Sequence, residues 1–183
     1  MARYLGEYGS KGVSKAVIIS SVPPYLLKTA DNPDGLDSNV FAGIQKAVAA
    51  DRYAFFTGFF QNFYNTDVFL GKRVTEQVVR ASWKIAAGAS ASASFACVPT
   101  WHEDFRDDLA RIDVPTLVIQ GDADRILPIT ATGLLTAKLI KGARQLIVKD
   151  GPHAVTWTHA EEVNAGLLSF LSETAGVLRK DVA

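Results

Sequence analysis

Two short apolar runs constrain the fold of this chain more than any other feature of its sequence. Residues 116–119 are Thr-Leu-Val-Ile and residues 145–148 are Gln-Leu-Ile-Val, and neither run alternates with polar residues. Such runs are typical of parallel strands whose two faces are both covered by helices. Between them we expect one helix, with Thr130 as its N-cap and Gly142 just past its end. The order strand–helix–strand predicts a right-handed parallel unit and therefore an α/β fold.

A third apolar run, Val17-Ile18-Ile19, predicts another strand. Residues 40–105 show apolar side chains at helical spacing instead, and they contain every Phe of the chain except Phe170. This stretch is too long for one crossover between strands, so we interpret it as an inserted helical lid with an aromatic core. We thus expect parallel strands near residues 15–20, 115–120 and 144–149 and three parts: residues 1–24 (the end of a helix and the first strand), residues 25–106 (the helical lid) and residues 107–183 (the C-terminal strands and helices).

Composition excludes several classes of protein. The 19 Lys and Arg balance the 19 Asp and Glu, whereas proteins that bind nucleic acid or an anionic membrane surface have a basic bias. The single cysteine, Cys97, cannot form a disulfide within the chain and is expected at a buried apolar site. No Cys and His have the spacing of zinc ligands, so we expect no metal. The first residues lack the apolar run of a signal peptide, and no segment has the roughly 20 apolar residues of a membrane span. The expectation is a single-domain, soluble, cytoplasmic protein.

Titratable side chains follow two of the expected strands at the point where each strand ends. The second strand is followed by Gly121-Asp-Ala-Asp-Arg-Ile-Leu-Pro128, and the third by Gly151-Pro-His153. Ligands of open parallel sheets bind beyond the carboxyl ends of the strands. A carboxylate and an imidazole at neighbouring strand ends are the arrangement that a catalytic acid–histidine pair requires.

These two segments resemble the acid turn and the histidine loop of α/β-hydrolases, in the acid-before-histidine order of that family. Three further segments are similar to cofactor-free (non-haem) haloperoxidases and arylesterases, and the Pro23-Pro24 pair in the first of them points to the haloperoxidase branch. The resemblance extends over essentially the whole chain. The further segments are residues 21–35, 112–119 and 158–168.

The resemblance implies that Asp124 is the catalytic acid and His153 the catalytic base, and that Asp122 stabilises the turn through backbone amides. Two alternatives stay open. Asp124 could be a solvated loop carboxylate paired with Arg125, and His153 could be a turn histidine at a strand end. The other histidines, His102 and His159, are expected at surface or cap positions.

The nucleophile of the family is absent from this sequence. An α/β-hydrolase needs Gly-x-Ser-x-Gly at a strand-to-helix turn. Gly9-Ser10-Lys11-Gly12 has the wrong spacing, and Gly88-Ala-Ser90-Ala-Ser92 has a serine in place of the second glycine and follows a predicted helix. Residues 2–6 are similar to the helix directly after the elbow in the family. The resemblance therefore implies the C-terminal part of a hydrolase, inactive on its own.

A complete relative would form an acyl-serine and release it to water, or to peroxide as a peracid that oxidises halide, without cofactor, metal or haem. The expected partners are a small acyl ester, or a carboxylic acid with peroxide, and an N-terminal complementing fragment or a second copy of the chain. Phe60 and Ile126 are candidates for contact with the substrate, although most lid Phe are expected in the core. The alternatives are a non-catalytic truncated or oligomerising fragment and a plain carboxylic-ester hydrolase.

Overall fold

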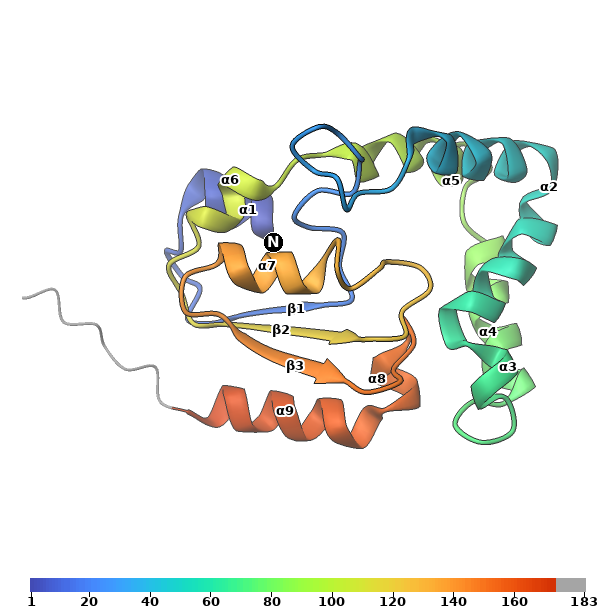
Figure 1. The fold of residues 1–183 in the computed structure, drawn as a ribbon. Helices are drawn as coiled ribbons and strands as arrows, with labels where there is room; N and C mark the ends of the chain where they lie inside the picture. The colour runs from blue at the N-terminus through green and yellow to red at the C-terminus, as the bar shows by residue number, and fades with distance from the viewer. Residues whose placement is uncertain (174–183) are drawn as a thin grey trace, which may run out of the picture.

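The computed structural model describes residues 1–173 and contains a three-stranded parallel sheet (Figure 1). The strands are β1 (Ala16–Ile19), β2 (Thr116–Gly121) and β3 (Arg144–Val148), in the order β1-β2-β3. Ile18 lies opposite Val118, and Ile119 lies opposite Leu146. The three predicted strands and the parallel α/β fold are confirmed.

Helices cover both faces of the sheet, which explains why its strands do not alternate with polar residues. In Figure 1, α1 (Ala2–Tyr8), α6 (Arg106–Ala110) and α7 (Gly133–Leu139) lie on one side, and α8 (Val155–Thr158) and α9 (Ala160–Ser172) on the other. Alternate strand residues enter two separate cores. The first contains Ala2, Leu5, Ala16, Ile18, Leu109, Ile112, Val118 and Ile140, and the second contains Leu117, Ile119, Val148, Val155, Val163 and Phe170.

A helical segment connects β1 to β2 and lies beyond the carboxyl ends of the strands (Figure 1). It begins with α2, where the Asp37 side chain accepts a hydrogen bond from the Asn39 amide. At Asp51 the backbone leaves the helical region (φ −158°, ψ 93°), and the Asp51 side chain caps the second half of α2 through the amides of Tyr53 and Ala54. The elements of this segment are α2 (Ser38–Tyr64), α3 (Thr66–Phe69), α4 (Glu76–Ala87), α5 (Ala91–Ala96) and the 3-10 helix η1 (Val98–His102).

An aromatic cluster forms the core of the segment. Phe56, Phe60, Tyr64 and Phe69 are buried in it, together with Val74, and Ala154 of the histidine loop joins them. The helical prediction for residues 40–105 is confirmed. All of these residues are described, and they contain no strand and only one isolated β-bridge, between Leu70 and Val74. The boundaries of the three predicted parts stay a prediction.

Two local predictions are wrong. Helix α7 begins at Gly133 and not after Thr130, because residues 129–132 form a turn. In this turn the Thr132 hydroxyl donates hydrogen bonds to the side-chain oxygen of Gln120 and to the carbonyl of Pro128. Cys97 is exposed at the junction between α5 and η1 and does not lie at a buried apolar site. Among the helices of residues 1–173, none combines the length and apolar character needed to cross a bilayer. The cytoplasmic location stays a prediction.

Candidate active site

The acid turn after β2 holds the carboxylate of Asp124 in a fixed position. Its side chain is fully buried, and its Oδ1 accepts hydrogen bonds from the amides of Ile126 and Leu127, both at 2.9 Å. The other oxygen, Oδ2, accepts a hydrogen bond of 3.2 Å from the side-chain amide of Gln120. A buried carboxylate needs such donors, since burying an ionised group without partners is costly. They also fix which oxygen faces the next strand.

The histidine loop after β3 brings His153 to that oxygen. The distance from His153 Nδ1 to Asp124 Oδ2 is 2.9 Å, so the predicted pairing is confirmed in its geometry. When Nδ1 carries the proton and donates a hydrogen bond to the carboxylate, Nε2 of the neutral ring keeps a lone pair. The ring side chain is 16% exposed and packs edge-on against Phe63, with 4.8 Å between ring centroids. The pair can therefore present a base at Nε2.

The neighbouring charged residues have other partners. Asp122 accepts a hydrogen bond of 2.6 Å from the amide of Asp150, which agrees with the turn-stabilising role predicted for it. Arg125 forms a two-pronged ion pair with Asp67 of α3, at 2.7 and 3.0 Å, and this contact lowers the pKa of the Asp67 carboxyl. Arg125 therefore does not pair with Asp124, and the alternative in which Asp124 is a solvated loop carboxylate paired with Arg125 is contradicted.

Sequence reasoning missed Gln120, which is 2% exposed and connects the acid turn to α7. Its Nε2 donates to Asp124 Oδ2 and to the carbonyl of Leu127, while its Oε1 accepts from Thr132 Oγ1 and the amide of Gly133. Its side-chain amide thus makes four hydrogen bonds within the protein, two as donor and two as acceptor. A polar residue at the end of an otherwise apolar strand was the available signal.

A cavity of about 670 Å³ opens between the strand ends and α2, and His153 lines it. Most of its wall is apolar, and Ile126 is part of that wall, as predicted. Phe60 lies instead in the buried aromatic cluster, while Phe55 and Phe59 line the cavity. Successive residues of a helix point about 100° apart, so Phe59 and Phe60 face different surroundings. The wall is formed by Ser20, Ser21, Val22, Leu26, Leu36, Val40, Phe41, Ile44, Ala54, Phe55, Gly58, Phe59, Asn62, Trp101, Arg125, Ile126, Leu127 and His153.

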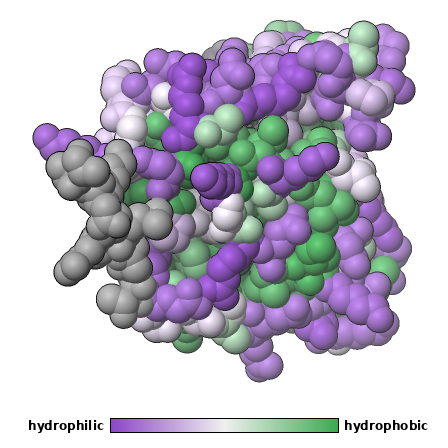
Figure 2. Space-filling model, turned by 60° about the vertical axis from the view of Figure 1, so that its left-hand side comes forward, coloured by the Kyte–Doolittle hydropathy of each residue, from purple (hydrophilic) through white to green (hydrophobic). Residues whose placement is uncertain are grey.

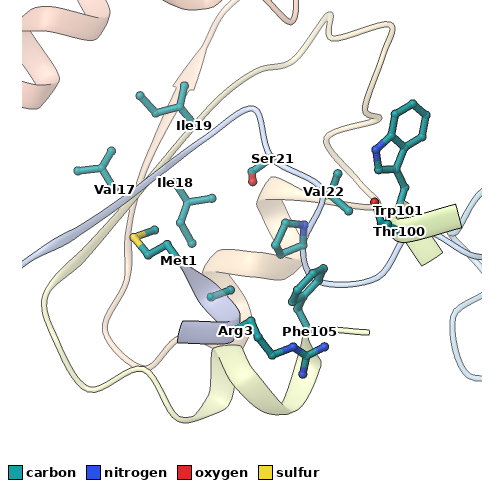
Figure 3. Close-up of a pocket in the computed structure, with 12 residues that line it drawn as sticks. Met1, Arg3, Val17, Ile18, Ile19, Ser21, Val22, Thr100, Trp101 and Phe105 are labelled. Carbon is teal, nitrogen blue, oxygen red and sulfur yellow. The ribbon is translucent and has the colours of Figure 1, made fainter. Parts of the chain in front are cut away.

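A second cavity, of about 590 Å³, lies along β1 (Figure 3). In Figure 3, Ile18 points to one side of the strand, toward Met1, while Val17 and Ile19 point to the other. The guanidinium of Arg3 lies over the ring of Phe105, 5.1 Å from its centroid. Neither Asp124 nor His153 lines this cavity, so it is not the site of acid–base chemistry.

The two other histidines are less exposed than expected. His159 is at the N-cap position of α9 as predicted, but it is buried and not at the surface. Its Nδ1 lies 2.9 Å from Thr158 Oγ1, and its burial, followed by the charge of Arg73, lowers its pKa. His102 is half-buried, with its ring edge-on to Phe41. Within residues 1–173 no group of three His, Cys, Asp or Glu side chains could hold a metal ion.

Ser90, whose flanking sequence is most like the elbow motif, lies between α4 and α5 and not at a strand-to-helix turn. It is exposed, and its Oγ caps α5 by accepting a hydrogen bond of 3.3 Å from the Ala93 amide. Its surroundings are those of a helix cap. The 183 residues contain no Gly-x-Ser-x-Gly sequence.

The structure is thus that of an α/β protein in which a buried carboxylate and an imidazole are paired at the ends of neighbouring parallel strands. The family model described as "alpha/beta hydrolase fold" matches residues 1–160, and the chain belongs to this family.

Several of the similar proteins carry the names of haloperoxidases or esterases. A Synechocystis sp. protein that carries the name of a non-heme chloroperoxidase is 56% identical over 93% of this chain and 62% of its own length. The bifunctional esterase/perhydrolase DCH of Acinetobacter calcoaceticus is 33% identical over 93% of this chain and 62% of its own length. The crystal structure of a bromoperoxidase from Bacillus anthracis aligns with a TM-score of 0.89 and 37% identity, covering 94% of this chain and 63% of that one. The chain thus spans less than two thirds of the length of these relatives.

Proposed function

We propose that this chain supplies the acid, Asp124, and the base, His153, of a serine-hydrolase triad of the haloperoxidase and esterase kind. The observation that carries the proposal is the contact between His153 Nδ1 and Asp124 Oδ2, made by a buried carboxylate at the carboxyl end of a parallel strand. The carboxylate would hold the ring in the Nδ1–H tautomer and stabilise the imidazolium that forms during turnover.

The reaction would use a serine from outside these 183 residues. Nε2 of His153 would take the proton from the serine hydroxyl as that oxygen attacks the acyl carbonyl, and would pass it to the leaving alcohol. Water or hydrogen peroxide, deprotonated by the same nitrogen, would then release a carboxylic acid or a peracid and return the proton to serine. The peracid would oxidise halide and revert to the acid. The names of the relatives, which include an esterase/perhydrolase and non-heme haloperoxidases, support both branches.

The substrate would be a small apolar acyl compound. The cavity beside His153 is lined by Phe55, Phe59 and Ile126 and has few polar groups, which is typical of sites that select apolar ligands. A plain carboxylic-ester hydrolase differs only in the second nucleophile and has the same support. The comparison that separates the two is the rate of peracid formation against ester hydrolysis in the complemented protein.

We propose further that the chain alone is inactive, and that the free edge of β1 accepts the part of a hydrolase that carries the serine. Triad members act as a unit, so an acid and a base without the nucleophile provide little catalysis. Among residues 1–173, β1 pairs only with β2, and the second cavity follows β1.

Complementation tests this function. Turnover of p-nitrophenyl acetate is measured for the purified chain, with and without a fragment that carries the Gly-x-Ser-x-Gly elbow, taken from the part of a relative that this chain does not cover. We expect activity in the mixture and its loss in His153→Gln, with Ser90→Ala unchanged. A mixture that associates without turnover would favour the alternative of a non-catalytic fragment. Strong turnover by the chain alone that requires His153 would contradict the need for an outside serine.

A further inference from the structure

The joint between α2 and α3 contacts the acid turn directly. Asn65 lies between the two helices with left-handed backbone angles (φ 46°, ψ 58°) and is 2% exposed. Its Nδ2 donates a hydrogen bond of 2.9 Å to the carbonyl of Ala123, the residue immediately before Asp124. Asparagine tolerates this backbone region better than most residues with a side chain. An asparagine at this position thus suits the backbone of the joint and also supplies the side-chain donor for Ala123.

The same joint also contacts the histidine loop. The carbonyl of Phe63 accepts a hydrogen bond of 3.0 Å from the amide of Ala154, and the Phe63 ring packs against the ring of His153. Two residues apart in sequence, Phe63 and Asn65 therefore contact the two loops that meet at the acid–histidine pair. A displacement of the joint would change the position of one loop relative to the other.

Asn65 is better suited to this positioning than the ion pair beside it. Asp67 and Arg125 are exposed by 63% and 42% at their side chains, and exposed ion pairs are screened by water and salt. The Asn65 amide is buried, and its Oδ1 is enclosed without a hydrogen-bond partner among residues 1–173. Rotating the amide would bring Oδ1 against the Ala123 carbonyl, acceptor against acceptor. The orientation with Nδ2 on Ala123 is therefore fixed.

We propose that Asn65 is a positioning residue for the acid–histidine pair. It holds the backbone of the acid turn on the α2–α3 joint, while Phe63 of the same joint holds the histidine loop. Asp124 Oδ2 is thereby kept on His153 Nδ1, and the ring is kept in the Nδ1–H tautomer. The helical segment thus sets the geometry of the pair in addition to lining the cavity. The inference rests on the proposed function only for its catalytic meaning, because the geometry can be measured without turnover.

The test is nitrogen-15 NMR of the histidine rings in the 183-residue chain, with the signals of His153 assigned by their loss in His153→Gln. We expect wild-type His153 to show a single tautomer with the proton on Nδ1. Two variants remove the donor: Asn65→Asp keeps the shape of the side chain, and Asn65→Gly keeps the left-handed backbone at low cost. We expect both to lose the single-tautomer signature of His153. The matched control, Asp67→Asn, removes the exposed ion pair of the same joint and should leave the signature unchanged.

Retention of the Nδ1–H tautomer in both Asn65 variants would overturn the proposal. It would also be overturned if the signals of His102 and His159 changed as much as those of His153, because that pattern indicates a general loss of structure. In a complemented, active mixture, we expect Asn65→Gly to lower kcat with little change in KM. If the mixture has no activity while the tautomer still depends on Asn65, the proposed function fails and the positioning role stands.

Discussion

At the scale of single residues, the position of a charged group is decided by its hydrogen-bond donors more than by its neighbours in sequence. Asp122 and Asp124 are two residues apart in the same turn, yet one accepts a surface amide and the other is buried with donors on both oxygens. Family resemblance selected Asp124 correctly as the residue opposite His153. The role of Gln120 could not be predicted in the same way, because it depends on contacts that join the acid turn to Thr132 and to Gly133 of α7.

His159 gives the stability of the folded chain a pH dependence. Burial and the charge of Arg73 lower its pKa below the ordinary value of 6.5, against smaller opposing effects of Glu162 and Asp150. The folded protein therefore favours the neutral ring, while the unfolded chain takes up a proton near pH 6.5. The stabilising contribution of neutral His159 is complete above pH 6.5, and it is lost as the pH falls through the lower pKa of His159 in the folded protein. We expect the free energy of unfolding, measured in urea, to fall over this range.

The matched variants are His159→Gln, which should reduce that pH dependence, and His102→Gln, which should retain it. An equal fall of stability with pH in wild type and His159→Gln would contradict the assignment.

At the scale of elements, the strands were predictable and the helical phase was not. Three apolar runs are short enough to be strands, and the loops after them fixed the functional edge of the sheet. The residues of α2 that face the core could not be predicted with a single helical period, because the backbone break at Asp51 changes the direction of the side chains between Val48 and Phe55. Phe59 and Phe60 both follow that break and are both apolar, so the sequence does not distinguish the one that lines the cavity from the one that is buried. The exposure of Cys97 and the burial of His159 depend on contacts between elements, which periodicity does not contain.

The end of β2 and the histidine loop are packed too closely for any side chain at residue 121. A Cβ on Gly121 would collide with the backbone of Gly151, which cannot move as a flexible side chain can. We expect Gly121→Ala to lower the free energy of unfolding by more than about 2 kcal/mol, because overpacking here must displace backbone. The measurement is urea unfolding followed by circular dichroism.

Gly43 is the matched control for this substitution. It is exposed in α2, and a Cβ there would meet nothing within 4 Å. Gly43→Ala should stabilise the chain by about 0.5–1 kcal/mol through helix propensity. If both glycine variants change stability by the same sign and size, the close approach of Gly121 to Gly151 is not the cause.

At the scale of the whole molecule, the sheet has a free edge and an apolar surface. Among residues 1–173, β1 has a strand partner on one side only, and Val17 and Ile19 are half-buried. Figure 2 shows one face of the molecule on which apolar residues form a broad band between polar ones. Large contiguous apolar surfaces mark interaction sites, and free strand edges attract other strands. The free edge of β1 agrees with a sheet that is extended by another chain segment in the proposed complemented hydrolase.

The last prediction concerns this edge when no complementing fragment is present. We expect a second copy of the chain to take its place, so that the sedimentation coefficient rises with protein concentration. Val17→Lys places a charge on the edge strand and should keep the chain monomeric, because a charged edge resists pairing. Leu168→Lys is the matched control, since Leu168 is 69% exposed on α9 and its replacement should leave self-association unchanged. Adding the serine-bearing fragment should reduce self-association in wild type, because both partners would compete for β1. If the wild-type chain stays monomeric at all concentrations, or if Val17→Lys self-associates as strongly as wild type, β1 is not the interface.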